Sequence, residues 1–276
     1  MNYIELNCKV FPAEPASDIL MAQLADIGYE SFMESDTGLL AYIPEEHFDA
    51  AALNELPVIT MGMFDISFEY AEIEQENWNA LWESNYEPVT IAGRCHVRAP
   101  FHEPLPTADY DIVVEPKMSF GTAHHETTFL TVQLMLDVDF SGKSVLDMGS
   151  GTGILSILAS KMGAAKVVGI DNERWAYENA IENFERNNIT NAEVIHGDAA
   201  NIPEQPFDIV LANINRNTLL QDMAAYSEVL KSKGIILLSG FYEHERSIML
   251  AEAEKYGIHE VRHIEKNDWV AIEAKK

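Results

Sequence analysis

Cysteine and long apolar runs are scarce in this sequence. Only two cysteines, Cys8 and Cys95, occur among 276 residues. They are too few and too far apart for a disulfide framework or a zinc site built on paired thiolates, so we expect both to be reduced. No apolar run approaches the roughly eighteen residues that a membrane span needs, and residues 1–11 lack the charged-then-apolar pattern of an export signal. These absences favour a cytoplasmic protein without a membrane partner.

Basic residues are also scarce. Lysine and arginine total 18 against 45 acidic residues, which gives a formal net charge of −27. A protein that binds a phosphate backbone needs a cluster of basic side chains, and none occurs along the chain, so we expect no direct nucleic-acid binding. The acidity either provides solubility alone or attracts a basic protein partner. We expect a monomer.

The length suits two domains, and the first is predicted over residues 1–71. Periodicity and turn residues predict the order β-α-β-β-α-β. The expected strands are 3–10, 31–33, 38–43 and 65–71, and the expected helices are 17–27 and 44–53. This order predicts a small α+β domain of the ferredoxin-like type. Residues 72–87, with Trp78, Leu81 and Trp82 at helical spacing, are predicted to form a linker helix.

The second domain is predicted over residues 88–276. Residues 88–111 are rich in Pro and His without a sustained period, which indicates an irregular lead-in. Helices and strands then alternate. The expected strands are 144–148, 166–170, 193–196, 207–212 and 234–239, with a closing pair at 261–266 and 269–274. The expected helices are 127–136, 154–162, 175–187, 219–230 and 244–256. This alternation predicts an α/β fold whose parallel sheet is covered on both faces.

A glycine-rich turn follows the first of these strands. Gly149, Gly151 and Gly153 stand between a predicted strand and a predicted helix. Glycines let the backbone turn sharply and approach a ligand closely, so the turn is a candidate nucleotide-type site. The nicotinamide fingerprint G-x-G-x-x-G fails if counted from Gly149, because Ile154 takes the third position. Counted from Gly151, the third position is Ser156, a small residue, so a nicotinamide cofactor stays an alternative.

Three carboxylates and one amide mark the ends of neighbouring strands. Asp147 precedes the turn, where it would repel a pyrophosphate but could bind a ligand ammonium group. S-adenosylmethionine has an amino group and no phosphate. Asp171, about 20 residues beyond the turn, is placed to bind ribose hydroxyls, although it could instead cap the next helix. Asp198 could accept from an adenine amino group or be a solvated loop residue. Asn213 ends the fourth strand, at the edge where open α/β sheets bind ligands, although it could simply form a turn.

Several segments together resemble the PrmA family, bacterial enzymes that methylate protein eleven of the large ribosomal subunit. They are Ser119-Phe120-Gly121-Thr122-Ala123-His124-His125-Glu126-Thr127-Thr128, Asp147 to Gly153, Gly169-Ile170-Asp171, Ala212-Asn213-Ile214 and Asn77-Trp78 through Trp82. The resemblance implies a ferredoxin-like domain before a class I, Rossmann-like methyltransferase domain. It places cofactor contacts on Thr128, Gly149, Asp171 and Asn213.

The sequence departs from this family at a few positions. Ala123 stands where glycine is usual, Ser150 where Cys or Thr is frequent, and Asn215 where an apolar residue is common. Ala123 reduces backbone freedom in its loop. The adjacent His124 and His125 face different ways and have no third partner at zinc spacing, so we expect no metal.

The resemblance implies that S-adenosylmethionine donates methyl groups to lysine side chains and an N-terminal amine of a basic large-subunit ribosomal protein. The first domain would recognise that protein, and Asn213 could orient the amine. The cofactor set is expected to include Asp147, Gly151, Gly153 and Asp198 besides the family contacts. A methyltransferase for another protein or a small molecule, and a nicotinamide-dependent oxidoreductase, are the alternatives.

Overall fold

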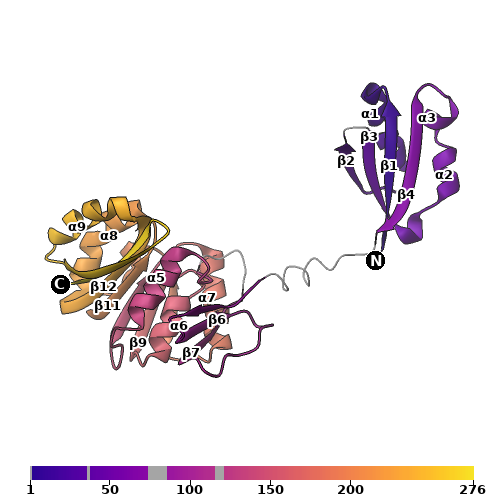
Figure 1. Ribbon diagram of the computed structural model, residues 1–276. Helices are drawn as coiled ribbons and strands as arrows, with labels where there is room; N and C mark the ends of the chain where they lie inside the picture. The colour runs from indigo at the N-terminus through magenta and orange to yellow at the C-terminus, as the bar shows by residue number, and fades with distance from the viewer. Residues whose placement is uncertain (1, 36–37, 74–85, 116–120) are drawn as a thin grey trace. The chain divides into compact units, whose positions relative to one another are not determined.

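Two compact units make up the chain, one within Met1–Asn85 and one formed by Tyr86–Lys276 (Figure 1). The computed structural model describes residues 2–35, 38–73, 86–115 and 121–276. The expected linker helix falls almost entirely on residues 74–85, outside the described residues. The two units are therefore described separately.

Unit 1 has a four-stranded antiparallel sheet in the order β2-β3-β1-β4. Its elements are β1 (Tyr3–Phe11), α1 (Ala13–Asp26), β2 (Ser31–Ser35), β3 (Gly38–Pro44), η1 (Glu45–His47), α2 (Ala50–Asn54), α3 (Pro57–Thr60) and β4 (Asp65–Ile73). Alternate residues of β1 are buried, because successive side chains of a strand point to opposite faces of the sheet. Ile4, Leu6, Cys8 and Val10 thus share a core with Leu20 of α1 and the residues around it.

The single helix expected over residues 44–53 is wrong. A 3-10 turn and the separate helix α2 take its place, because Phe48 and Asp49 have extended backbone conformations. The Asp49 side chain accepts a hydrogen bond from the Ala51 amide at 2.8 Å and so caps α2. An aspartate that can satisfy a free helical amide favours starting a new helix over continuing the old one.

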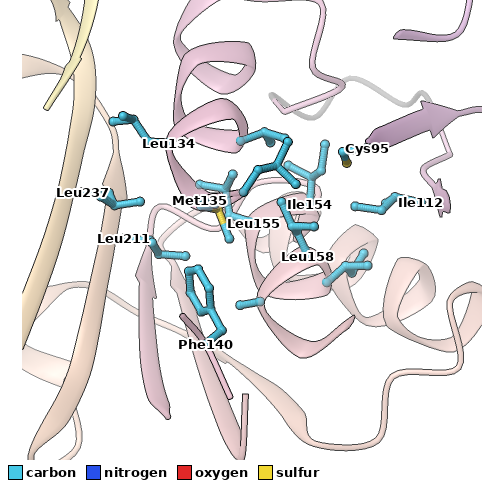
Figure 2. Packing of buried hydrophobic residues seen from close by; sticks show 14 of the residues in the cluster. Cys95, Ile112, Leu134, Met135, Phe140, Ile154, Leu155, Leu158, Leu211 and Leu237 are labelled. Carbon is cyan, nitrogen blue, oxygen red and sulfur yellow. The ribbon is translucent and has the colours of Figure 1, made fainter. Parts of the chain in front are cut away.

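Unit 2 begins with a small sheet of β5 (Val89–Ile91), β6 (Cys95–Arg98) and β7 (Tyr110–Val113). These strands correct the expectation of an irregular lead-in. They are too short to produce a clear period, yet their apolar residues are buried. Figure 2 shows Cys95 and Ile112 packed beside Ile154 and Leu158 of α6 (Ile154–Lys161) in the same unit.

The main sheet of unit 2 has seven strands in the order β10-β9-β8-β11-β12-β14-β13. Its elements are α5 (Glu126–Met135), β8 (Ser144–Met148), α6 (Ile154–Lys161), β9 (Lys166–Asp171), α7 (Arg174–Arg186), β10 (Ala192–His196), η2 (Ala199–Asn201), β11 (Phe207–Asn213), α8 (Arg216–Val229), β12 (Leu230–Tyr242), η3 (Glu243–Glu245), α9 (Arg246–Glu254), β13 (His259–Lys266) and β14 (Trp269–Lys275). The first five strands in this order are parallel, whereas β14 runs antiparallel to β12 and β13. The expected parallel sheet is therefore mixed at one edge.

Each face of this sheet has its own core. Along β11, Ile209 and Leu211 belong to the core with α5, α6 and α7, while Val210 and Ala212 belong to the core with α8 and α9. Consecutive strand residues are apolar because both faces are covered, as expected from the sequence. Figure 2 shows Leu211 and Leu237 of the sheet facing Leu134 and Met135 of α5.

Both cysteines are free and buried, and burial raises the pKa of each thiol to about 12. Among the described residues, none of the helices combines the length and apolar character that a bilayer span requires.

Candidate functional site

The strand order reverses direction between β8 and β11, and ligands bind open α/β sheets at such a switch point. The glycine turn lies there, between β8 and α6. Gly149, Gly151 and Gly153 have φ values of +69°, +55° and +79°, a region that favours glycine. A Cβ atom on Gly149 would lie 2.0 Å from Cγ2 of Ile214, and one on Gly153 would lie 2.7 Å from the Phe184 ring. Gly149 and Gly153 thus allow close contact with neighbouring elements.

Asp171 ends β9 and holds the turn. Its Oδ2 atom accepts a hydrogen bond from the Gly151 amide at 2.8 Å, and its Oδ1 atom accepts one from the Glu173 amide at 3.0 Å. Residue Glu173, and not Asp171, occupies the N-cap position of α7, so the helix-cap alternative for Asp171 is wrong. A carboxylate oxygen can accept more than one hydrogen bond, so this geometry still permits contact with ribose hydroxyls.

Asp147 lies beneath the turn and has no exposed surface. Its Oδ2 atom accepts hydrogen bonds from the Ser156 hydroxyl at 2.7 Å and the Ser156 amide at 3.1 Å. Its Oδ1 atom has no partner among the described residues. Burial raises the pKa of this carboxyl to about 6, with the hydrogen bonds from Ser156 opposing the shift and the charge of Asp171 adding to it.

Asn213 ends β11, and its Nδ2 atom donates to Oγ1 of Thr128 on α5 at 3.1 Å. The Oδ1 atom of Asn213 is buried without a hydrogen-bond partner among the described residues. Thr128 is fully buried. Two predicted residues, 85 positions apart in the chain, are therefore brought together.

Two adjoining cavities open at this sheet edge, and both are lined by Gly149, Asp171 and Ile214. The larger, of about 390 Å³, is also lined by Gly151 and Asn213. The smaller, of about 150 Å³, is also lined by Asp198. Asp147, Gly153 and Thr128 line neither cavity, so they lie behind the residues that do.

Asp198 is exposed and occupies the N-cap position of η2. Its Oδ1 atom accepts from the Ala200 amide at 2.9 Å, and its own amide donates to Asn201 at 3.0 Å. The capping role explains why an aspartate follows β10 even without a ligand.

Sequence reasoning missed the aromatic walls of the larger cavity. His125, Trp175 and Trp269 line it, and the His125 and Trp269 rings lie 4.8 Å apart. Trp175 is 45% exposed at the start of α7. An exposed tryptophan four residues after a predicted ribose-binding aspartate was the available signal, because large aromatic side chains often mark binding surfaces.

The segment before α5 is fastened to the glycine turn. Ser119 and Phe120 of the family-like motif lie outside the described residues, but Thr152 of the turn donates from Oγ1 to the Gly121 carbonyl at 2.6 Å. Ala123 has a φ of +65°, so the alanine that replaces the usual glycine adopts a left-handed conformation. Asn215, the other departure, caps α8 by accepting from the Thr218 amide at 3.1 Å.

No group of three His, Cys, Asp or Glu side chains among the described residues is arranged to hold a metal ion. The expectation of a metal-free site stays a prediction.

Solved structures share the fold of part of this chain. A ribosomal protein L11 methylase from Lactobacillus delbrueckii subsp. bulgaricus superposes with a TM-score of 0.64 at 21% identity, over 68% of this chain and 98% of that one. A methyltransferase from Pyrococcus furiosus gives 0.50 at 16% identity, over 59% and 88%. At these identities the likeness shows the α/β methyltransferase fold alone.

Sequence relatives are much closer. A ribosomal protein L11 methyltransferase of Bacteroides fragilis is 42% identical over 276 residues, 99% of each chain. One of Porphyromonas gingivalis is 43% identical over 265 residues, 94% of this chain and 90% of that one. The family described as "Ribosomal protein L11 methyltransferase (PrmA)" matches residues 13–276. These matches confirm the resemblance, and with it methyl transfer from S-adenosylmethionine. The chain belongs to the PrmA family of ribosomal protein L11 methyltransferases.

Proposed function

We propose that this chain binds S-adenosylmethionine in the larger cavity and methylates lysine side chains and the N-terminal amine of ribosomal protein L11. One observation carries the proposal. Asn213 lines that cavity, and its Oδ1 atom is buried without a partner among the described residues. A buried acceptor of this kind costs free energy unless a ligand satisfies it.

The residues present fit the cofactor. A volume of about 390 Å³ lies within the roughly 300–1,000 Å³ of small-molecule sites. Gly149 and Gly240 let their backbones pack directly against Ile214 in the cavity wall, since a Cβ atom on either would lie 2.0 Å from an atom of Ile214. We assign ribose to Asp171, which lines both cavities, and the adenine side to Asp198, so that the adenine end of the cofactor would extend from the larger cavity into the adjoining smaller one.

Asp147 would act on the cofactor indirectly, without touching it. It is fully buried and lines neither cavity, so it supports the turn through Ser156. Its unpartnered Oδ1 atom supplies negative potential below the turn, which favours a ligand ammonium group above it. Gly151 would present backbone to the ligand, and Gly153 would keep α6 close to α7.

The cofactor supplies an activated methyl group on a positively charged sulfur, so the chain's own work is to position a neutral amine. A lysine amine has an ordinary pKa of about 10.4 and must lose a proton first. The walls formed by His125, Trp175 and Trp269 would exclude water and lower the pKa of an entering amine. Oδ1 of Asn213 would then accept from the amine, while the bond from Nδ2 to Thr128 fixes the amide plane.

We further propose the expected domain roles. Residues 1–71 form a ferredoxin-like domain that recognises the protein substrate, residues 72–87 form a linker helix, and residues 88–276 form the catalytic domain. The β-α-β-β-α-β order and the strand order β2-β3-β1-β4 support the first assignment. The division of the contacts between Asn85 and Tyr86 supports the boundary.

Radiolabelled methyl transfer to purified ribosomal protein L11 tests this function, with Asn213→Ala as the variant. Loss of the orienting acceptor is expected to lower kcat roughly 100-fold. Asn217→Ala is the matched control, because Asn217 is exposed on α8 and lines neither cavity. Methylation of other proteins or of small molecules in preference to L11 would contradict the proposal, and so would stabilisation by NADH in place of S-adenosylhomocysteine.

A further inference from the structure

Asn183 lies in the third turn of α7 and is fully buried, although it lines neither cavity. Its Nδ2 atom donates a hydrogen bond to the Thr152 carbonyl of the glycine turn at 2.9 Å. Its Oδ1 atom accepts one from the amide of Glu115, just beyond β7, at 3.0 Å. A buried amide costs free energy unless its polar atoms are paired, and an apolar side chain would avoid that cost. The two bonds give the Asn183 amide a fixed orientation between two segments that are far apart in the chain.

The glycine turn packs directly on α7. A Cβ atom on Gly153 would lie 2.7 Å from the Phe184 ring, so only a glycine allows this approach. The neighbouring Thr152 donates from Oγ1 to the Gly121 carbonyl at 2.6 Å, and its own carbonyl is held by Asn183. Thr152 has no exposed surface, so bulk water cannot take the place of the Asn183 amide.

The same helix also forms part of the wall of the larger cavity. Trp175 and Ala176, at the start of α7, line that cavity together with Gly149 and Gly151 of the glycine turn. Ala176 and Asn183 are seven residues apart, about two helical turns, so both lie on the buried face of α7. The hydrogen bond from Asn183 therefore sets the position of the turn relative to the helix that carries the Trp175 wall.

We propose that Asn183 is a positioning residue for S-adenosylmethionine, because its amide holds the glycine turn and α7 at the spacing that the cofactor requires. This inference rests on the proposed function, since it takes the larger cavity to be the cofactor site. Asn183 does not hold the residue assigned to the amine, because Asn213 is held by Thr128 of α5. Loss of the Asn183 amide should therefore weaken cofactor binding more than it slows methyl transfer.

Asn187, one turn further along α7, offers a matched control. Its Oδ1 atom accepts from the Val113 amide at 3.0 Å, and its Nδ2 atom donates to the Val113 carbonyl at 2.6 Å and to the Asn183 carbonyl at 2.8 Å. Asn187 is also buried. It thus ties β7 to the same helix, but it makes no hydrogen bond to the glycine turn within the described part of the chain.

Cofactor binding by Asn183→Ala and Asn187→Ala in the full-length protein tests the proposal. Asn183→Ala is expected to raise Kd for S-adenosylhomocysteine, measured by titration calorimetry, and KM for S-adenosylmethionine about tenfold. Its kcat at saturating cofactor should fall less than about threefold. Asn187→Ala should leave Kd and KM within about twofold of the wild type. Urea unfolding identifies the conditions in which both variants are fully folded, and binding is compared there.

Asn183→Asp separates the two hydrogen bonds and keeps the test decisive if Asn183→Ala does not fold. The carboxylate still accepts from the Glu115 amide, but it has no proton to donate to the Thr152 carbonyl. Its charge is offset by Arg186, whose Nη1 atom lies 3.5 Å from Oδ1 of Asn183. The same loss of cofactor affinity, about tenfold, is expected, with Asn187→Asp as its control.

The outcomes separate this inference from the proposed function. Equal cofactor affinities in the Asn183 and Asn187 variants would overturn the positioning role alone. Wild-type affinity in Asn183→Asp would do the same, because it would show that the bond to the Thr152 carbonyl is not needed. A wild type that is not stabilised by S-adenosylhomocysteine would overturn the proposed function, and this inference with it.

Discussion

Replacing Gly149 with alanine should destabilise the fold in two ways that glycine avoids. The first is conformational, because the φ of +69° would cost an alanine about 1–2 kcal/mol. The second is steric, because the new Cβ would lie 2.0 Å from Cγ2 and 3.5 Å from Cβ of Ile214. Cγ2 is attached directly to the branched Cβ, so the whole side chain must shift, at about 1–3 kcal/mol. We expect Gly149→Ala to lower the free energy of unfolding by about 2–5 kcal/mol.

Gly142→Ala is the matched control. Gly142 also has a φ of +69°, but an added Cβ would meet nothing within 4 Å. Its substitution should cost only the conformational part. Urea unfolding of both variants gives the steric part as the difference between them.

Cofactor binding gives a second measurement on the same variants. Ile214 lines both cavities, so its displacement in Gly149→Ala should weaken S-adenosylhomocysteine binding by at least tenfold, while Gly142→Ala binds normally. The reasoning is refuted if the two variants lose equal stability, or if Gly149→Ala binds the cofactor product as the wild type does.

Two further substitutions test the carboxylates beside the turn. Asp171→Ala removes the acceptor of the Gly151 and Glu173 amides and should abolish thermal stabilisation by S-adenosylhomocysteine; undiminished binding would contradict the ribose assignment. For Asp147→Asn the sign follows from a pKa of about 6 in the folded protein, above its ordinary value near 3.9. The carboxyl then stabilises the fold below about pH 4 and loses up to ~3 kcal/mol of that stabilisation as pH rises through 6. Urea unfolding at pH 4.5 and 7.5 should show a smaller fall in stability for Asp147→Asn than for the wild type, and an equal fall would contradict the burial argument.

The elements from Ser144 onward could be predicted closely because each buried strand is a short apolar run and each helix is bounded by polar turns. The strand over 144–148 has its expected bounds in the structure. The three strands before residue 114 escaped prediction because three or four residues are too few to show a period of two. The helix over 44–53 failed for a different reason, since apolar spacing does not reveal where Asp49 interrupts the backbone.

Site residues at the carboxyl ends of the parallel strands could be predicted from the sequence. Site residues that reach the cavity only through the pairing of distant strands could not. Asp171 and Asn213 follow apolar runs, and parallel strands bring such ends to one edge. Trp269 reaches the same cavity from β14, an antiparallel strand inserted beside β12. No local pattern gives that insertion, because it depends on which strand pairs with which.

Asp147 lies on a strand whose residues from Val145 to Met148 are all buried, and this burial gives it a different contact from the one that its chemistry suggests. A carboxylate before a glycine turn was expected to touch the ligand. Asp147 is instead fully buried and held by Ser156 of α6. Ser156 is the residue that occupied the third position of the alternative nicotinamide fingerprint, counted from Gly151. Its small hydroxyl is needed there to donate to Asp147, and the Gly169 Cα–H also faces it, since a Cβ on Gly169 would lie 3.4 Å from the Ser156 hydroxyl. A small residue at this position therefore reflects a buried carboxylate under the turn, and it carries no information about a pyrophosphate above it.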